Sequence, residues 1–303
     1  MTWVVLRGTG GIWRVRDEAG TVREASLRGR LKQGDTLKLA VGDEVELEPD
    51  ERGSGAWAIS AIHPRRSRLA RRAPGGGQGE RVVAANVDQV VVVFAAARPD
   101  PHPRMLDRFL VIAAANDVPA RIVLNKMDLA PAGLRERFAP YAGMGYAVHV
   151  TSTVTGEGLS ELHEALRGRV SALTGPSGVG KSSLLNAIYP GLGLRVGEIS
   201  RSVNKGRHTT VGADMHPIPE GGYVVDTPGL REVGVWNIPA AALDACFIEL
   251  RPLLDRCRFR DCRHRAEPAC AVREAVDAGL VTRERYESYR KLLDELEASE
   301  RPW

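Results

Sequence analysis

Cysteine, aromatic residues and long apolar runs are all scarce in this 303-residue chain. Only four cysteines occur, and three of them lie between Cys257 and Cys270 beside a histidine, which favours a metal site over a disulfide framework. The longest uninterrupted run of aliphatic and aromatic residues, Val90 to Ala97, is too short to cross a bilayer, and the first residues lack the layout of a signal peptide. We therefore expect a cytoplasmic protein with no membrane partner.

The net charge is also small, at +4, but it is unevenly distributed. Three short segments, Pro64 to Arg81, Arg195 to Arg207 and Arg256 to Arg265, carry +5, +3 and +4, which leaves −8 on the remainder of the chain. Such clustering is typical of a protein that binds a polyanion. Each segment taken alone is also compatible with an exposed loop.

The first part of the chain, up to about Ile62, has the pattern of a small all-β domain. Glycine-containing turns separate five short apolar or alternating runs, TWVVLR, GIWRVRD, TVREASL, DEVELEP and AWAISAI. This spacing predicts a five-stranded barrel of the oligonucleotide-binding (OB) type, with an SH3-like barrel as the structural alternative and a packing module as the functional one. The region holds nine basic and ten acidic residues, so only Arg28, Arg30 and Lys32 are candidate contacts to nucleic acid.

The second part alternates between strand and helix patterns. Residues 64–81 combine arginine pairs with a glycine run and predict a flexible basic linker. Beyond it, strands are predicted at 82–97, 120–125, 146–150 and 170–174, and helices at 103–117, 132–142 and 159–166. Strands that alternate with helices indicate a parallel sheet with ligand loops at the carboxyl ends of its strands.

A phosphate-binding loop is predicted at GPSGVGKSS, which matches G-x-x-x-x-G-K-[ST] between a β-prone run and a helix-compatible run. Its glycines allow backbone N–H groups to turn toward a phosphate, and the following helix adds its positive N-terminal end. Lys181 is predicted to reach the β- and γ-phosphates, and the Ser182 hydroxyl to ligate Mg²⁺. The predicted nucleotide-binding residues of this loop are Gly175, Pro176, Ser177, Gly178, Val179, Gly180, Lys181, Ser182 and Ser183.

A base-reading loop of the form N-K-x-D, Asn125, Lys126, Met127 and Asp128, comes directly after Leu124. A carboxylate at Asp128 can accept from both N1–H and the exocyclic amine of guanine, which adenine does not offer. Asn125 is predicted to tie this loop to the phosphate loop, and the stem of Lys126 to cover the base. Thr151, Ser152 and Thr153, at the end of the next predicted strand, lie where such proteins contact the guanine carbonyl, and Ser152 is the candidate among them.

A third motif, D-x-x-G, begins at Asp226 after the predicted strand GYVVD. Asp226 is placed to hold Mg²⁺ through water, and the N–H of Gly229 to meet the γ-phosphate. The preceding segment, from Ile188 to Gly212, has the character of a switch in which Thr209 or Thr210 closes on Mg²⁺. Because N-K-x-D precedes the phosphate loop, the order of motifs indicates a circularly permuted GTPase whose chain leaves the domain soon after D-x-x-G.

A metal site is predicted near the C-terminus. Cys257, Cys262, His264 and Cys270 offer three thiolates and an imidazole, a tetrahedral set suited to one structural Zn²⁺. Cys246 has apolar neighbours and is interpreted as a core residue. Five arginines lie in the same loop, so a bound metal ion would hold a cationic surface in a fixed shape. A polar helix is predicted from Arg283 to Leu296.

The permuted order, AANVDQVVVV, GPSGVGKSSLLN, KGRHTT, DTPG and the Cys/His cluster together resemble the ribosome small-subunit-dependent GTPase A family. The resemblance covers essentially the whole chain. It implies a role in late assembly of the small subunit, GTP hydrolysis stimulated by that subunit, and release after hydrolysis. It also implies that the barrel and the zinc-binding region bind rRNA.

The residue after D-x-x-G is Leu230, where many GTPases have the glutamine that orients water. His208 is the candidate replacement, because an imidazole can position or deprotonate water and the resemblance implies a catalytic histidine there. A contact between His208 and RNA phosphate is the alternative, given the neighbouring Lys205 and Arg207. The predicted catalytic residues are His208, Thr209, Thr210, Asp226 and Gly229.

We therefore predict a multidomain, monomeric protein with an OB-type barrel (1–63), a flexible basic linker (64–81), a circularly permuted P-loop GTPase α/β domain (82–236) and a mainly α zinc-binding domain (237–303). The leading hypothesis is a GTPase that hydrolyses GTP to GDP and phosphate, with Mg²⁺, on the small ribosomal subunit and its rRNA. The alternative is a non-catalytic zinc and OB RNA-binding scaffold with a structural nucleotide site. A P-loop nucleotide kinase is disfavoured, because N-K-x-D and D-x-x-G have no shared role there.

Overall fold

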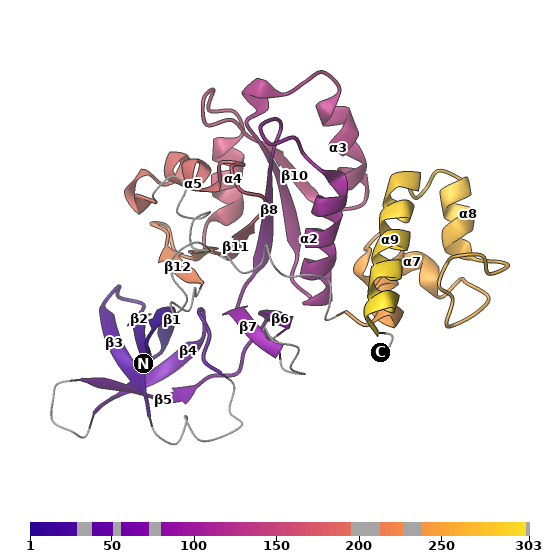
Figure 1. The fold of residues 1–303 in the computed structure, drawn as a ribbon. Coiled ribbons are helices and arrows are strands. Elements are labelled where there is room, and N and C mark those ends of the chain that lie inside the picture. Colours follow the sequence, from indigo (N-terminus) through magenta and orange to yellow (C-terminus); the bar gives the residue numbers. More distant parts are fainter. Residues whose placement is uncertain (29–37, 51–55, 73–79, 195–212, 227–237, 301–303) are drawn as a thin grey trace.

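The computed structural model describes residues 1–28, 38–50, 56–72, 80–194, 213–226 and 238–300. Within these ranges the chain forms an N-terminal barrel, a central sheet flanked by helices, and a helical C-terminal region that lies beside the helix of residues 103–115 (Figure 1). No helix in the described ranges is both long and apolar enough to cross a membrane.

The N-terminal barrel is closed, with the strand order β1-β2-β3-β5-β4. Its strands are β1 (Trp3–Thr9), β2 (Ile12–Arg16), β3 (Val22–Leu27), β4 (Glu44–Pro49) and β5 (Trp57–Ile62). Alternate side chains such as Val5, Val15, Val45 and Ile59 are fully buried inside it. Strand β3 pairs in parallel with β5, whereas the other pairs are antiparallel. This crossed closure confirms the predicted OB-type barrel.

The segment predicted to be a flexible linker contains β-strands on both sides of its glycine run. Strands β6 (Arg68–Arg72) and β7 (Glu80–Ala85) form an antiparallel two-stranded sheet. The apolar side chain of Leu69, embedded among arginines in the sequence, is fully buried in the main core. Burial of that side chain orders a stretch whose composition alone favours a coil. Residues 73–79, which include the glycine run, lie outside the described residues.

The single strand predicted from Val82 to Ala97 is instead two strands, β7 and β8 (Gln89–Ala95), separated by Asn86. Asn86 has a φ of 55°, in the left-handed region that asparagine tolerates better than most residues. Its buried side chain accepts from the N–H of Arg66 at 2.8 Å and donates to the carbonyl of Gly42 at 2.9 Å. The turn therefore interrupts the predicted strand, and the Asn86 side chain joins this point of the chain to Gly42 of the barrel and to Arg66.

The central sheet has six strands in the order β10-β9-β8-β11-β13-β12. Besides β8, its strands are β9 (Ala120–Asn125), β10 (Ala147–Val150), β11 (Val170–Thr174), β12 (Asp214–Pro217) and β13 (Tyr223–Asp226). All neighbours are parallel except β12 and β13. The parallel sheet is as predicted, and β12 is an antiparallel edge strand that the sequence pattern did not reveal.

Helices cover both faces of this sheet, which explains why β8 is a continuous apolar run (Figure 1). Val92 and Phe94 belong to the core shared with α2, whereas Val91 and Val93 belong to the core under α4 and α5. The helices between the strands are α2 (Pro103–Ala115), η1 (Met127–Leu129), α3 (Leu134–Gly143), α4 (Leu159–Leu166), α5 (Lys181–Ile188) and η2 (Pro190–Leu192).

The barrel contacts the β12 edge of the sheet. The Nε atom of Arg7 on β1 lies 3.3 Å from Oδ1 of Asp214 on β12, and Arg16 donates to the hydroxyl of Tyr223 at 3.4 Å. Nearby, a Cβ on Gly42 would lie 2.2 Å from the carbonyl oxygen of Ala85, so only glycine fits this approach. The barrel therefore packs on the strand that comes directly after the predicted switch segment.

The C-terminal region is helical, as predicted, and shares its core with the sheet. Its elements are η4 (Ala240–Ala242), η5 (Asp244–Cys246), α7 (Arg251–Leu254), α8 (Ala271–Asp277) and α9 (Arg283–Glu300). Buried Phe247, Tyr289 and Leu293 belong to the same hydrophobic cluster as Leu106 and Phe109 of α2. Helix α9 was predicted to end at Leu296 and extends to Glu300.

Candidate nucleotide and metal sites

The predicted nucleotide loops meet at one edge of the central sheet. Strand pairing places Ala95 of β8 beside Asn125 of β9, and Leu173 of β11 beside Asp226 of β13. Because these strands are parallel, the segments that follow them emerge at the same edge. N-K-x-D, Ser152, the phosphate loop and Asp226 therefore come together. His208, Thr209, Thr210 and Gly229 lie outside the described residues.

The phosphate loop has a backbone that requires glycine. Gly175, Gly178 and Gly180 have φ values of 134°, 78° and 93°, all in the range that L-residues rarely adopt. A Cβ on Gly175 would lie 2.0 Å from the carbonyl oxygen of Val93 on the neighbouring strand. Helix α5 begins directly after Gly180, so its free N–H groups face the space above the loop. This arrangement suits an anionic ligand.

Lys181 and Ser182 are the first residues of α5, and both are buried. The Nζ atom of Lys181 donates to the carbonyl oxygens of Gly175 at 2.9 Å and Pro176 at 2.7 Å. The ammonium group is thus held over the turn of the loop, where a phosphate oxygen would find both the lysine charge and the helix N-terminus.

Asn125 joins the two ligand loops, as predicted. Its Nδ2 donates to the carbonyl oxygen of Val179 at 2.9 Å, and its Oδ1 accepts from the hydroxyl of Thr151 at 3.2 Å. A Cβ on Gly180 would lie only 2.6 Å from that Nδ2 atom. The second glycine of the phosphate loop is therefore needed both for its backbone conformation and for the approach of Asn125.

Asp128 is exposed, and its carboxylate is oriented by Ser152. The fully buried hydroxyl of Ser152 donates to Oδ1 of Asp128 at 2.5 Å and accepts from the N–H groups of Val154 and Thr155, each at 3.2 Å. Ser152 was predicted to lie at a guanine carbonyl, and this stays a prediction. In the structure its side chain also positions the residue predicted to read the base.

Lys126 spans the same edge of the sheet. Its Nζ donates to the carbonyl oxygens of Arg98, at 2.5 Å, and Gly178, at 2.6 Å, so its stem lies across the gap between the two loops. Arg98 belongs to the segment after β8 and was missed by the sequence analysis. Its position at the carboxyl end of a predicted central strand was the available signal.

The Cys/His cluster is assembled as predicted. The three thiols and the imidazole of Cys257, Cys262, His264 and Cys270 place their ligand atoms within 4.8 Å of one another. The Sγ atoms of Cys257 and Cys270 are 4.0 Å apart, close to the spacing of about 3.8 Å that tetrahedral ligands at about 2.3 Å from a metal would have. The Nδ1 atom of His264 is 3.4 Å from the Cys270 sulfur and 3.6 Å from the Cys257 sulfur. These donors fit a four-coordinate metal ion.

Two acidic residues support this cluster, and neither was found from the sequence. Oδ2 of Asp244 lies 3.3 Å from Nε2 of the buried His264, which leaves Nδ1 facing the sulfurs. Glu267 accepts from the N–H groups of Arg263, Arg265 and Ala266. Burial alone raises the pKa of Glu267, but these backbone donors outweigh it and lower the pKa to about 2. The loop between the metal ligands is thus held by a permanent negative charge.

Replacing Asp244 by alanine is expected to weaken Zn²⁺ affinity about 10- to 100-fold, because a carboxylate on the second imidazole nitrogen orients the ring and makes it a better ligand. Competition between the protein and a chromophoric chelator measures this. Asp255→Ala, an exposed aspartate of the same region, is the matched control and should bind Zn²⁺ normally. Equal affinities of the two variants would contradict a role for Asp244.

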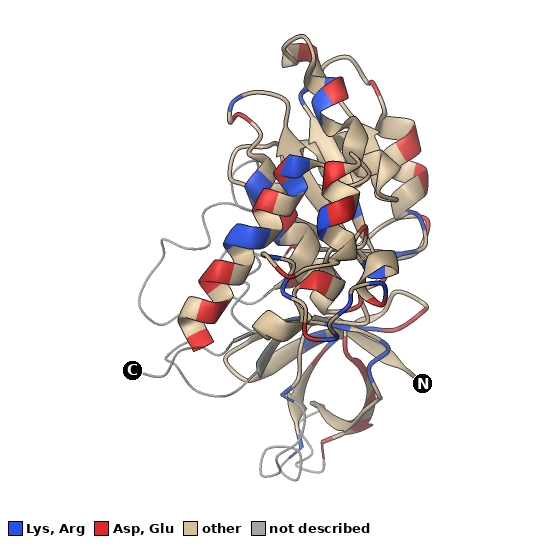
Figure 2. Ribbon diagram, turned by 90° about the vertical axis from the view of Figure 1, so that its right-hand side faces the viewer, with Lys and Arg blue, Asp and Glu red and all other residues tan. Residues whose placement is uncertain are grey.

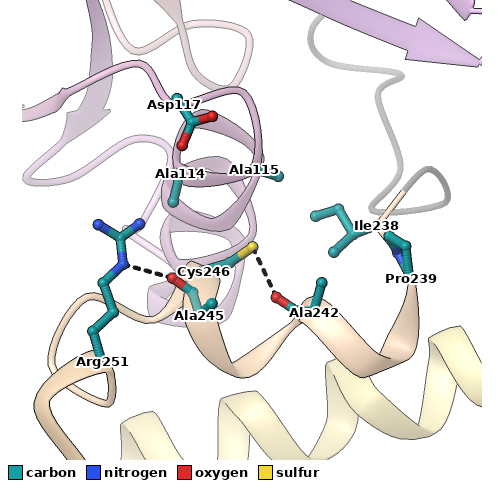
Figure 3. Close-up of a pocket in the computed structure, with 9 residues that line it drawn as sticks. All are labelled: Ala114, Ala115, Asp117, Ile238, Pro239, Ala242, Ala245, Cys246 and Arg251. Atoms are coloured by element: carbon teal, nitrogen blue, oxygen red, sulfur yellow. Dashed lines mark hydrogen bonds between the residues drawn. The ribbon is translucent and has the colours of Figure 1, made fainter. Parts of the chain in front are cut away.

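A separate cavity of about 340 Å³ lies between the end of α2 and residues 238–251 (Figure 3). Four of its nine lining residues are alanines, and Cys246 and Arg251 lie on the side of the C-terminal region. Cys246 is buried, as predicted, and burial raises the pKa of its thiol to about 11. None of the residues predicted to bind nucleotide lines this cavity.

Comparison with known proteins agrees with this geometry. The model of a family described as RsgA GTPase matches residues 62–236. The relative named small ribosomal subunit biogenesis GTPase RsgA from Gemmatimonas aurantiaca is 61% identical over 298 residues, which cover 97% of each chain. The relative of the same name from Moorella thermoacetica is 44% identical over 304 residues, which cover 99% of each.

Two solved structures have the same overall fold. The crystal structure of YjeQ from Thermotoga maritima superposes with a TM-score of 0.80 at 37% identity, covering 97% of this chain and 98% of that one. YloQ, described as a circularly permuted GTPase, superposes with a TM-score of 0.77 at 28% identity, covering 100% of this chain and 96% of that one.

Proposed function

The chain belongs to the RsgA GTPase family, whose members hydrolyse GTP, and from this premise we propose that it assists late assembly of the small ribosomal subunit. In the proposed cycle the GTP-bound protein binds the subunit, the subunit stimulates hydrolysis to GDP and phosphate, and the protein is then released. The relatives' shared name supports the partner. We further propose that the protein acts as a cytoplasmic monomer and contacts rRNA, which the clustering of its basic residues supports.

The observation that carries this proposal is the hydrogen bond from Asn125 to Val179, which joins a base-reading loop to a phosphate loop. A nucleotide that bridges the two loops would place its phosphates at Lys181 and its base at Asp128. The Asp128 carboxylate, oriented by Ser152, is suited to accept two hydrogen bonds from guanine. The stem of Lys126 would cover the face of the base.

Hydrolysis requires groups at the phosphate end of the site. We propose that Ser182 and Asp226 hold Mg²⁺, which would neutralise charge on the phosphate oxygens, with Thr209 or Thr210 completing its shell. Lys181 would stabilise the β- and γ-phosphates, and the N–H of Gly229 would meet the γ-phosphate. His208 is proposed to orient water, since Leu230 offers no amide for that role.

The Cys/His cluster is proposed to hold one structural Zn²⁺. Three sulfurs and one imidazole leave no open position for a reacting water, so the ion would stabilise the loop rather than take part in hydrolysis. Its loop follows D-x-x-G in the chain, and the region packs on α2. A change at the γ-phosphate therefore has a short covalent route to the zinc-binding region.

Phosphate release measured with and without purified small subunits tests the proposal. We expect subunits to raise the rate of hydrolysis at least about tenfold. GTPase sites that a partner completes gain about 10³-fold or more in kcat, so tenfold is the lower bound of this expectation. Lys181→Ala should lose hydrolysis in both conditions. If the intact protein binds GTP but subunits leave its rate unchanged, the scaffold alternative replaces the GTPase cycle proposed here.

A further inference from the structure

An exposed aromatic ring lies in the loop between two of the metal ligands. Phe259 is 41% exposed and is the one aromatic residue among the large hydrophobic side chains that are exposed in the described parts of the chain. Elsewhere in the same region the rings of Phe247 and Tyr289 are buried. A single exposed hydrophobic residue is common on protein surfaces, so the meaning of this ring depends on the groups around it.

Arginines surround this ring. Arg256, Arg258 and Arg260 are exposed, and the guanidinium carbon of Arg258 lies 5.5 Å from the centre of the Phe259 ring. No ion pair of these three side chains is found with any of the residues that the structure describes, although Asp261 is adjacent in sequence. Arg265, by contrast, is paired with Asp294 at 2.6 Å and Glu297 at 2.8 Å. Residues 256–261, here named the Phe259 loop, thus present cations that no described carboxylate neutralises.

The Phe259 loop is held in place from both ends. Cys257 and Cys262, which flank the ring, belong to the metal cluster. The N–H of Arg258 donates to the carbonyl oxygen of Ala269 at 3.2 Å, and the N–H of Cys262 donates to the carbonyl oxygen of Phe259 at 3.3 Å. A ring presented by a fixed loop loses little conformational freedom on binding, which makes a single contact more effective. In Figure 2, where the C-terminal region faces the viewer, α9 shows basic and acidic residues mixed along its first half and only acidic ones along its second.

We propose that Phe259 stacks on an unpaired base of RNA while arginines of the same loop bind the flanking phosphates. An exposed ring beside guanidinium groups is the combination with which proteins hold single-stranded nucleic acid, since every base has a face to stack and every nucleotide a phosphate to neutralise. Bases inside an A-form duplex are stacked on one another and do not offer a face. A protein partner would favour apolar neighbours around the ring, and here the neighbours are cationic.

The proposal deepens the proposed function, because it names the kind of rRNA element that the C-terminal region would contact. It rests on that function only for the source of the RNA.

Phe259→Ala is expected to weaken binding of a short labelled oligouridine, measured by fluorescence anisotropy, about tenfold. Affinity for small subunits should fall in parallel. Phe259→Trp, which keeps a stacking surface, should bind at least as well as the native chain, and an RNA duplex of equal length should bind more weakly.

Leu280→Ala is the matched control, because Leu280 is a 79% exposed hydrophobic residue of the same region without adjacent arginines. Zinc content and circular dichroism of each variant verify folding. Equal binding by Phe259→Ala and Leu280→Ala, or no preference for single strands, would overturn stacking. Loss of subunit binding by Phe259→Ala without any binding of oligouridine by the native chain would assign the ring to a protein contact. Failure of subunits to stimulate GTP hydrolysis would refute the proposed function, yet the oligouridine comparison would still decide the stacking.

Discussion

Asp128→Asn is expected to lower the affinity for GTP about a hundredfold or more and to create affinity for xanthosine triphosphate. The native carboxylate can accept from both N1–H and the exocyclic amine of guanine, and each charge-assisted hydrogen bond contributes about 1.5–3 kcal/mol. An asparagine amide presents a donor where the carboxylate presents an acceptor. Xanthine has a carbonyl oxygen in place of the amine and therefore complements the variant. Titration calorimetry with both nucleotides measures the exchange.

The position of residue 128 should survive this substitution, because the Ser152 hydroxyl can donate to an amide oxygen as it does to the Asp128 carboxylate. Asp117→Asn, an exposed site at the end of α2 with a φ of 54° that asparagine tolerates, is the matched control and should leave GTP affinity unchanged. A variant at Asp128 that still prefers GTP would show that another group reads the base.

The parts of the site that could be predicted from the sequence are those whose functional residues are neighbours in the chain. In the phosphate loop, the glycines, Lys181 and Ser182 are neighbours in the chain, and their spacing alone implies the turn that the φ values of Gly175 and Gly180 confirm. The strands before N-K-x-D and the phosphate loop are short runs rich in apolar residues, and β9 and β11 have the predicted bounds. Helix α4 also has the predicted bounds. Parallel strands then bring the separate loops to one edge.

Contacts between residues far apart in the chain could not be predicted in this way. Ser152 and Asp128 meet only because β9 and β10 pair in a particular register, and Asp244 reaches His264 only because η5 packs under the metal loop. The turn at Asn86 depends on Arg66 and Gly42, which belong to other segments. In each case the sequence holds a polar residue of suitable type, but the partner is selected by tertiary packing.

The contact that joins the C-terminal region to α2 also depends on residues far apart in the chain and could not be predicted from the sequence. Arg285 of α9 is 3% exposed at its side chain, and its Nη1 contacts Oδ1 of Asp107 on α2 at 2.5 Å. Its Nε contacts Glu249 at 2.7 Å, while the hydroxyl of Tyr141 donates to Asp107 at 2.7 Å. Burial alone lowers the pKa of Arg285, but the two carboxylates outweigh it and raise the pKa above its ordinary value. One cation thus neutralises two acids from separate segments.

Arg285→Met is therefore expected to lower the free energy of unfolding by about 3–5 kcal/mol, because methionine fills much of the volume but leaves two buried carboxylates without a counter-charge. Denaturation in urea, followed by circular dichroism, measures the loss. Arg283→Met, on the exposed face of the same helix, is the control and should change stability by less than about 0.5 kcal/mol.

Combining Arg285→Met with Asp107→Asn and Glu249→Gln separates lost charge balance from lost packing. Neutral amides in place of the carboxylates remove the uncompensated charges, so the triple variant should recover a large part of the stability lost by Arg285→Met. If the triple variant is no more stable than the single one, the contribution of Arg285 comes from its packing against Phe247, whose ring centre is 4.5 Å from the guanidinium carbon, rather than from the ion pairs. Since α9 carries both Arg285 and the tyrosines that contact the metal loop, either result gives the contribution of the contact between α9 and α2 to the free energy of unfolding.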